Sequence, residues 1–118
     1  IGHGAMLHTL VQVAELAEAE GTSIEVIDLR SISPIDWDTI VASVSKTGRV
    51  VVSQEAPGNV SVASELAATL SERVFYSLEA PVVRVTGFDT PFPPAKLEQV
   101  YLPGSDRILD AIDRVMAY

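Results

Sequence analysis

Apolar residues recur at intervals of three or four positions in several stretches of the chain, which is the pattern of an amphipathic helix. In the first stretch these residues are Met6, Leu10, Val13 and Ala17, and they predict a helix over residues 5–20. Gly21 follows, and a glycine at that place is expected to end the helix in a left-handed conformation.

The later helices have start signals or long apolar faces. Ser33-Pro34-Ile35-Asp36 has a serine suited to the N-cap, a proline at the first helical position and an acid at the third, which predicts a helix from there to Gly48. A further helix is predicted over residues 60–75, and Ser105 is expected to cap a last one. The apolar faces are formed by Trp37, Ile40, Val41 and Val44, then by Val62, Leu66, Leu70 and Val74, and finally by Ile108, Ile112 and Val115.

Between these helices lie short runs rich in valine and isoleucine, which predict strands over residues 24–29, 49–53 and 82–86. Three valines in a row in the second run are typical of a strand buried on both faces of a parallel sheet. A turn is expected over residues 56–59. Alternating helices and strands predict an α/β fold, a three-layer αβα sandwich with a mostly parallel sheet.

The start of the chain departs from this scheme. Ile1-Gly2-His3-Gly4 leads directly into a helix, although an αβα sandwich needs a strand before that turn. We therefore expect residues 1–118 to form one domain of a longer protein, with the first strand truncated or missing. Such a domain would expose sheet edges that the longer protein covers.

Composition narrows the possible classes of protein. Hydrophobic residues make up 47% of the chain, which is typical of a globular domain. There is no cysteine, so a disulfide framework, a thiolate zinc site and thiol catalysis are excluded. The net charge of −8 disfavours nucleic acid and anionic membranes as partners and favours a basic protein.

Candidate chemistry is sparse along the chain. Gly2-His3-Gly4-Ala5-Met6-Leu7 is similar to the start of a dinucleotide-binding turn, with Asp28 where a ribose-binding acid would lie, but Leu7 replaces the third glycine. A tight turn, with Asp28 paired to Arg30 or to solvent, is the alternative. His3 and His8 lie five residues apart, which does not suit a shared metal on one helix. Glu55 follows a predicted strand, at the end of the sheet where α/β proteins bind ligands. The alternative is a buried glutamate that is hydrogen-bonded to loop amides.

Residues 84–103 hold four of the seven prolines and are expected to be irregular. Phe88, Pro91, Phe92 and Pro93 supply a rigid apolar surface that suits a subunit interface. The alternative is a surface loop that folds back on its own domain.

The chain resembles the C-terminal, transketolase-like domain of the β subunit of thiamine-diphosphate-dependent 2-oxo acid dehydrogenases. The matching stretches are GHGAMLH at 2–8, IEVIDLRSISPIDWDTI at 24–40, KTGRVVVSQEAP at 46–57, LEAPVVRVTGFDTPFP at 78–93, YLP at 101–103 and RILDAIDRVMAY at 107–118. The GFDTPFP segment and the terminal aromatic residue are more similar to the branched-chain enzyme than to the pyruvate enzyme. Gly58-Asn59-Val60-Ser61 departs from the glycine-rich turn of the family.

The resemblance implies a five-stranded, mostly parallel sheet in an α2β2 enzyme that decarboxylates a 2-oxo acid and transfers the acyl group to lipoyl. Thiamine diphosphate and magnesium would bind outside this domain, which would serve assembly and docking without catalytic residues of its own. The expected interface with the α subunit and the second β subunit is formed by Phe88, Asp89, Pro91, Phe92 and Pro93. Asp110, Asp113 and the Tyr118 carboxylate would dock the basic subunit-binding domain of the dihydrolipoyl acyltransferase.

The expected location is the bacterial cytoplasm, or the mitochondrial matrix of a eukaryote. Two alternative functions stay open at this point. One is the same domain in a pyruvate dehydrogenase or in another thiamine enzyme such as a transketolase or deoxyxylulose-phosphate synthase. The other is a free-standing module that binds a nucleotide or coenzyme A.

Overall fold

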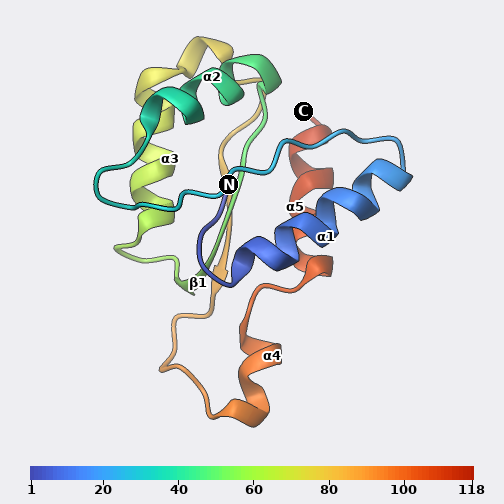
Figure 1. Cartoon of the computed structure of the whole chain (residues 1–118), viewed down its shortest axis with the longest axis vertical. Helices are drawn as coiled ribbons and strands as arrows, with labels where there is room; N and C mark the ends of the chain where they lie inside the picture. Colours follow the sequence, from blue (N-terminus) through green and yellow to red (C-terminus); the bar gives the residue numbers. More distant parts are fainter.

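Two parallel strands, β1 (Val51–Pro57) and β2 (Val83–Gly87), form the centre of the computed structural model, which describes residues 1–118. The helices α2 (Trp37–Thr47) and α3 (Val62–Arg73) cover one side of the strands, and α1 (Met6–Ala19) and α5 (Ser105–Met116) cover the other (Figure 1). The predicted α/β fold, with helices on both faces of a parallel sheet, is confirmed.

The two faces of the sheet bury separate apolar cores. The larger core joins Ile40 and Val44 of α2 to Leu66 and Leu70 of α3 and to Val52 of β1. The smaller core joins residues of α1 and α5 to β2, and its members are Met6, Leu10, Val13, Val85, Ile108 and Ala111. These are the faces that the helical spacing predicts, because residues three and four apart lie on one side of a helix.

The helix ends agree with the sequence at the glycines but differ at two caps. Gly21 and Gly48 have φ of 89° and 70°, the left-handed conformation expected of them. The N-cap of α2 is Asp36 and not Ser33, because the Asp36 carboxylate accepts the Thr39 amide at 3.1 Å and the Thr39 hydroxyl at 2.7 Å. Ser105 is the first residue of α5, and Gly104 precedes it as an N-cap without a side-chain hydrogen bond.

The strand predicted over residues 24–29 is not regular. Its one ladder contact is a parallel bridge between Gly2 and Asp28. Gly2 donates its amide to Ile27 and accepts from the Leu29 amide, both at 3.0 Å, while the Ile1 carbonyl accepts the Ser53 amide at 2.9 Å. Ile1 and Gly2 therefore lie between the 24–29 segment and β1. This segment is extended but lacks a long enough neighbour to pair with as a strand.

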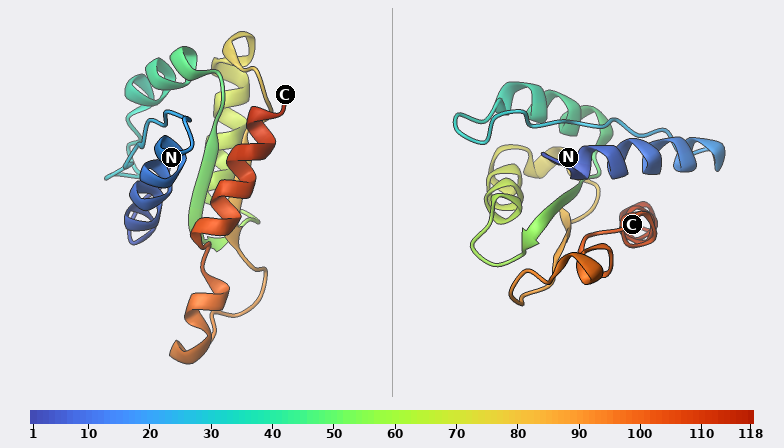
Figure 2. Two further views of the ribbon diagram at one scale, coloured as in Figure 1. Left: turned by 90° about the vertical axis from the view of Figure 1, so that its right-hand side faces the viewer. Right: turned by 60° about the horizontal axis from the view of Figure 1, so that its bottom comes forward.

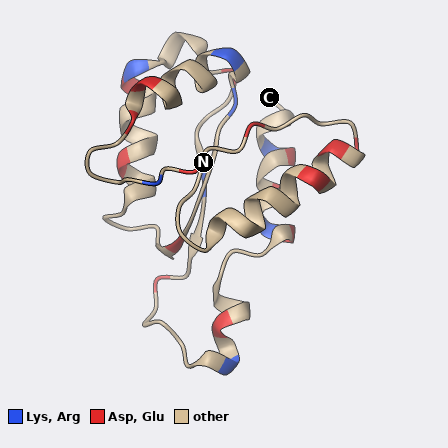
Figure 3. Cartoon of the chain, in the orientation of Figure 1, with Lys and Arg blue, Asp and Glu red and all other residues tan.

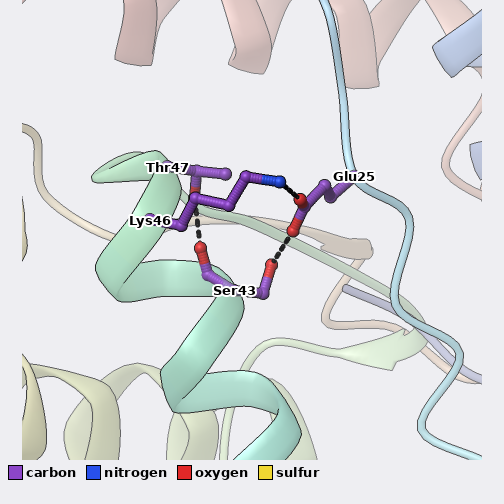
Figure 4. A network of polar contacts seen from close by, with 4 residues as sticks. All are labelled: Glu25, Ser43, Lys46 and Thr47. Atoms are coloured by element: carbon purple, nitrogen blue, oxygen red, sulfur yellow. Dashed lines mark hydrogen bonds and ion pairs between the residues drawn. The ribbon is translucent and has the colours of Figure 1, made fainter.

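Glu25 connects the extended segment to α2 through side chains (Figure 4). Its carboxylate accepts the Ser43 hydroxyl at 2.6 Å and forms an ion pair with Lys46, and the Thr47 hydroxyl bonds back to the Ser43 carbonyl. Hydrogen bonds from Lys46, and then from Ser43, lower the pKa of Glu25. The Glu25 carboxylate therefore stays ionised to a lower pH than an ordinary glutamate.

The proline-rich segment contains short helices, so the expectation that residues 84–103 are irregular is wrong in part. A 3₁₀ turn, η2 (Ala95–Leu97), leads into α4 (Glu98–Tyr101), and another short turn, η1 (Phe75–Ser77), follows α3. The prolines lie at 91, 93, 94 and 103, so residues 95–102 are free of proline and can form these two short helical elements. We call residues 88–102 the arm, since they extend below the body of the domain (Figure 2).

Candidate interface sites

Tyr101 fixes the base of the arm. It is buried, and its hydroxyl donates to the Phe88 carbonyl at 2.9 Å. Its ring packs edge-on against Phe92, with centroids 5.1 Å apart, and against Phe88 at 6.1 Å. Gly87 permits this approach, because a Cβ there would lie 2.8 Å from the Tyr101 ring and 2.1 Å from the Glu55 carbonyl oxygen.

Arg107 of α5 also contacts the base of the arm. Its guanidinium carbon lies 4.7 Å from the centroid of the Phe88 ring, and the group donates to the Thr86 carbonyl at 2.7 Å. Cation–π contact and a charge-assisted hydrogen bond together orient the start of the arm. Sequence reasoning missed Tyr101 and Arg107 as holding residues, because neither lies next to Phe88 in the chain.

The outer part of the arm is exposed. The side chains of Phe92, Leu97 and Val100 are 57%, 56% and 73% exposed, and Phe88 is half exposed beside Arg107. Asp89 and Pro91 are also exposed, and Pro93 is half-buried. The five predicted interface residues therefore lie together on the arm. Its base packs on the domain through Tyr101, and its outer part is exposed to solvent. Their role in an interface stays a prediction.

The turn after β1 lies beside the arm. Asn59 donates its side-chain amide to Asp89 at 2.8 Å, and Arg84 donates to the Gly58 carbonyl at 2.8 Å and to the Ser64 hydroxyl at 2.7 Å. Val60 in this turn has a φ of 45° and is fully exposed. A left-handed conformation is unfavourable for a β-branched residue, so Val60 is strained. It lies in the turn over residues 58–61 that the sequence marks as a departure from the family's glycine-rich turn.

The predicted docking acids lie on the exposed side of α5 and at its end. Asp110, Asp113 and Tyr118 are all exposed. Arg114 lies 4.0 Å from Asp110, one helical turn away, and Figure 3 shows both signs of charge on this helix. The charge of Asp110 is therefore partly neutralised by Arg114, which the prediction from the sequence did not include.

The start of the chain forms a tight turn. A Cβ on Gly2 would lie 2.5 Å from a methyl carbon of Leu10, so Gly2 is required by helix packing. Asp28 pairs with Arg30 at 2.6 Å, which confirms the structural alternative for that acid. Nε2 of His3 is buried without a hydrogen-bond partner, and His8 is exposed on α1.

The buried, hydrogen-bonded side chain in β1 is Gln54, and the expectation of a buried Glu55 is wrong. Gln54 is 1% exposed, whereas Glu55 is only half-buried and its carboxylate makes no hydrogen bond. The Gln54 side chain accepts the Ala63 amide at 2.8 Å and donates to the carbonyls of Ala56 and Pro57 at 3.1 and 2.8 Å. A neutral amide can both donate and accept here, which a carboxylate cannot do.

No three His, Cys, Asp or Glu side chains gather closely enough to hold a metal ion. None of the helices has the length and apolar character needed to cross a membrane.

Comparison with known proteins agrees with this geometry. Residues 1–108 match the family model described as the transketolase C-terminal domain. The chain is 59% identical, over all of its 118 residues, to a protein of Leifsonia xyli named pyruvate dehydrogenase E1 component subunit beta. It is 50% identical over 117 residues to a 3-methyl-2-oxobutanoate dehydrogenase subunit beta of Mycobacterium tuberculosis. It is 48% identical to a mitochondrial 2-oxoisovalerate dehydrogenase subunit beta of Dictyostelium discoideum.

These matches cover the whole of this chain or 98% of it, and 35%, 34% and 32% of the three relatives. The chain thus spans about a third of the length of the curated relatives it matches. Both pyruvate and branched-chain types occur among them, so the comparisons do not separate the two.

Proposed function

Because the chain belongs to the transketolase C-terminal domain family, we propose that it serves as the assembly and docking domain of a 2-oxo acid dehydrogenase β subunit. The parent enzyme would decarboxylate a 2-oxo acid and transfer the acyl group to lipoyl. The observation that carries the proposal is the similarity, along the whole chain, to β subunits of such enzymes. The arm gives this role a physical basis.

The arm has the properties of a subunit interface. Phe88, Pro91, Phe92 and Pro93 are apolar and rigid, so they lose little conformational entropy when a partner covers them. The base of the arm is already ordered by Tyr101 and Arg107. Pre-organisation of this kind lowers the free-energy cost of association. Asp89 accepts the Asn59 side-chain amide and adds a polar group next to Phe88, in keeping with the polar rim of an interface.

Phe92→Asp in the full α2β2 enzyme tests the interface. We expect the heterotetramer to dissociate, because a carboxylate would be buried without a partner. Tyr76→Asp is the matched control, since Tyr76 is a fully exposed aromatic residue outside the arm. Analytical ultracentrifugation gives the readout, and normal assembly of the Phe92 variant would show that the arm is not at the interface.

We assign the docking of a basic subunit-binding domain of the acyltransferase to the exposed end of α5. Asp110, Asp113 and the Tyr118 carboxylate offer charge-assisted hydrogen bonds to arginines of such a partner. The net charge of −8 favours the encounter with a basic domain. Arg114 beside Asp110 makes Asp113 and Tyr118 the freer acceptors.

Deleting Ala117 and Tyr118 is expected to weaken acyltransferase binding, with the loss greatest at low salt. Asp113→Asn is expected to act in the same direction, while Glu15→Gln on the exposed side of α1 serves as a charge-matched control. Titration calorimetry at two salt concentrations measures the effect. Equal affinity of the truncated and intact proteins would remove α5 from the docking site.

Thiamine diphosphate and magnesium belong, in this proposal, to parts of the parent enzyme outside the domain. Within the chain, no three His, Cys, Asp or Glu side chains gather closely enough to hold a cation. Calorimetry with NAD and with coenzyme A tests the free-standing module, and binding of either would favour that alternative.

Either a branched-chain 2-oxo acid or pyruvate is the substrate of the proposed parent enzyme. Features of the sequence favour the branched-chain type, while the 59% identity is to a pyruvate dehydrogenase subunit. Turnover of the assembled enzyme with 3-methyl-2-oxobutanoate and with pyruvate decides between them. The proposed location is the bacterial cytoplasm or, for a eukaryotic source, the mitochondrial matrix.

A further inference from the structure

An open groove of about 510 Å³ lies along the outer side of β2. β2 pairs with β1 alone, so its other long edge has no neighbouring strand. The groove is lined by Val82, Arg84 and Thr86 from the strand, by Gly58 from the turn after β1 and by Arg114 from the last turn of α5. The unpaired edge of the sheet is therefore the floor of a groove between two other elements.

The main chain of β2 presents hydrogen-bonding groups to this groove. The Val83 amide donates to the Val50 carbonyl, next to β1, at 3.1 Å. Because main-chain groups alternate in direction along a strand, those of Val82, Arg84 and Thr86 point away from β1. The Thr86 carbonyl already accepts the Arg107 guanidinium at 2.7 Å, which closes that end of the edge. The amide and carbonyl of Arg84 are left for a further strand.

The two charged side chains that line the groove are both arginines, although the chain has a net charge of −8. Arg84 lies on the α3 side, where its Nη1 donates to the Gly58 carbonyl and the Ser64 hydroxyl, and its Nε and Nη2 have no partner. Arg114 comes from α5, which covers the opposite face of the sheet (Figure 1), and its one ion pair, with Asp110, spans 4.0 Å. One cation thus flanks the edge on each face.

From these features we infer that the edge of β2 binds an extended, acidic segment of a partner protein, which adds to the sheet as a strand. The main-chain groups of Arg84 would supply hydrogen bonds that do not depend on the sequence of the segment. Consecutive side chains of a strand point to opposite faces. Two adjacent acidic residues would therefore meet Arg84 on one face and Arg114 on the other. About five residues match the edge from residue 82 to residue 86, a length of roughly 16 Å.

A separate acidic segment fits this edge better than a second copy of the same strand. If two copies of β2 paired around Arg84, the two Arg84 side chains would lie opposite each other, and like charges across a strand pair are unfavourable. The inference does not depend on the proposed function. The proposed docking acids Asp110 and Asp113 do not line the groove, and they would bind a partner of the opposite charge.

Three labelled peptides, added to the full protein that contains this chain, test the inference. The acidic peptide has a central Glu-Asp pair between alternating valine and threonine residues. The basic peptide has two lysines in place of that pair. The proline peptide keeps the acids but has proline on both sides of them, which removes amide donors without changing the charge. Fluorescence anisotropy measures the Kd of each peptide, and hydrogen exchange of the Arg84 amide reports strand pairing.

We expect the acidic peptide to bind about tenfold more tightly than the other two, to bind less tightly as salt rises, and to slow exchange of the Arg84 amide about tenfold. Arg114→Gln should weaken its binding about threefold, as for an exposed ion pair, and Arg84→Gln should act in the same direction. Arg114 carries the test, because it is exposed and holds no other part of the chain in place. Arg73→Gln, an exposed cation of α3 outside the groove, is the charge-matched control and should not change the Kd.

Three results would overturn the inference. One is equal binding of the acidic and basic peptides, and another is binding of neither. The third is equal binding of the acidic and proline peptides, because the two arginines would then attract carboxylates without any strand being added to β2.

Discussion

Gln54 offers the sharpest test of how the end of β1 is connected to the start of α3. Its side chain accepts the Ala63 amide and donates to the carbonyls of Ala56 and Pro57. The Ala63 amide belongs to the first turn of α3, where no helical carbonyl is available to accept it. Replacing Gln54 by leucine would keep much of the volume and remove all three hydrogen bonds.

The loss in free energy of unfolding depends on whether water can replace each lost hydrogen bond. Ala63 is fully buried, so its amide would be left without a partner, at a cost of about 1–3 kcal/mol. Ala56 is exposed and Pro57 half-buried, so water can replace those two bonds at a cost of about 1 kcal/mol in total. We expect Gln54→Leu to lower the free energy of unfolding by about 2–4 kcal/mol, a fall in Tm of roughly 10 °C.

Gln54→Glu distinguishes the hydrogen bond that the Gln54 side chain accepts from the two that it donates. A carboxylate can still accept the Ala63 amide, but it would face two carbonyl oxygens to which it cannot donate, so its folded-state pKa would be raised above the ordinary value. A raised carboxyl pKa stabilises the fold at pH below the unfolded pKa, and this stability is lost as pH rises through the folded pKa. The variant should therefore be nearest to the wild type in acid and weakest at neutral pH.

Urea unfolding followed by circular dichroism, repeated from pH 4 to pH 7, measures the effect. Gln12→Glu on the exposed side of α1 adds the same charge without burial and is the matched control. If Gln54→Glu is as stable as this control at pH 7, or gains stability as pH rises, the account of the Gln54 hydrogen bonds is wrong.

Three further predictions use melting temperature as the readout. Gly87→Ala should destabilise the domain by about 3 kcal/mol or more, because its Cβ would meet the Glu55 carbonyl oxygen at 2.1 Å. Gly104→Ala has nothing within 4 Å, so it should cost clearly less and lose only a favourable N-cap residue. Val60→Gly should stabilise the domain by about 1 kcal/mol, because it relieves a φ of 45° at an exposed valine, and a lower Tm would contradict the strain. Asp36→Ala should lower the Tm at pH 7, because the Thr39 hydroxyl and then the Thr39 amide lower the pKa of Asp36. This stabilisation is lost as pH falls through the folded pKa, so the two proteins should converge in acid, and a constant difference would refute it.

The helices and the two buried faces could be predicted from the sequence because each depends on neighbours in the chain. Leu66 and Leu70 are one helical turn apart, so their spacing alone places them on the same helix face. The glycines at 21 and 48 end the helices that directly precede them. The caps were less predictable. Ser33 and Asp36 both suit an N-cap, and in the structure the Asp36 carboxylate accepts both the amide and the hydroxyl of Thr39.

Contacts between distant parts of the chain could not be predicted from local patterns. Tyr101 lies 13 residues from its acceptor Phe88, and Arg107 lies 21 residues from Thr86. Residues 24–29 have the composition of a strand, yet a strand needs a paired neighbour, and only Ile1 and Gly2 lie beside them. Glu55 and Gln54 are both polar, and which of them is buried depends on the irregular register between Ser53 and Pro57.

The separation of the two apolar cores by the sheet bears on how such a domain can change over time. No helix contributes buried residues to both cores, so a smaller side chain at Ile40 leaves the packing around Ile108 untouched. Losses on opposite sides should then simply add, as they do for sites that share no partner. Each side can drift, or be redesigned, without matching changes on the other, and the strands between them are the part that must stay constant.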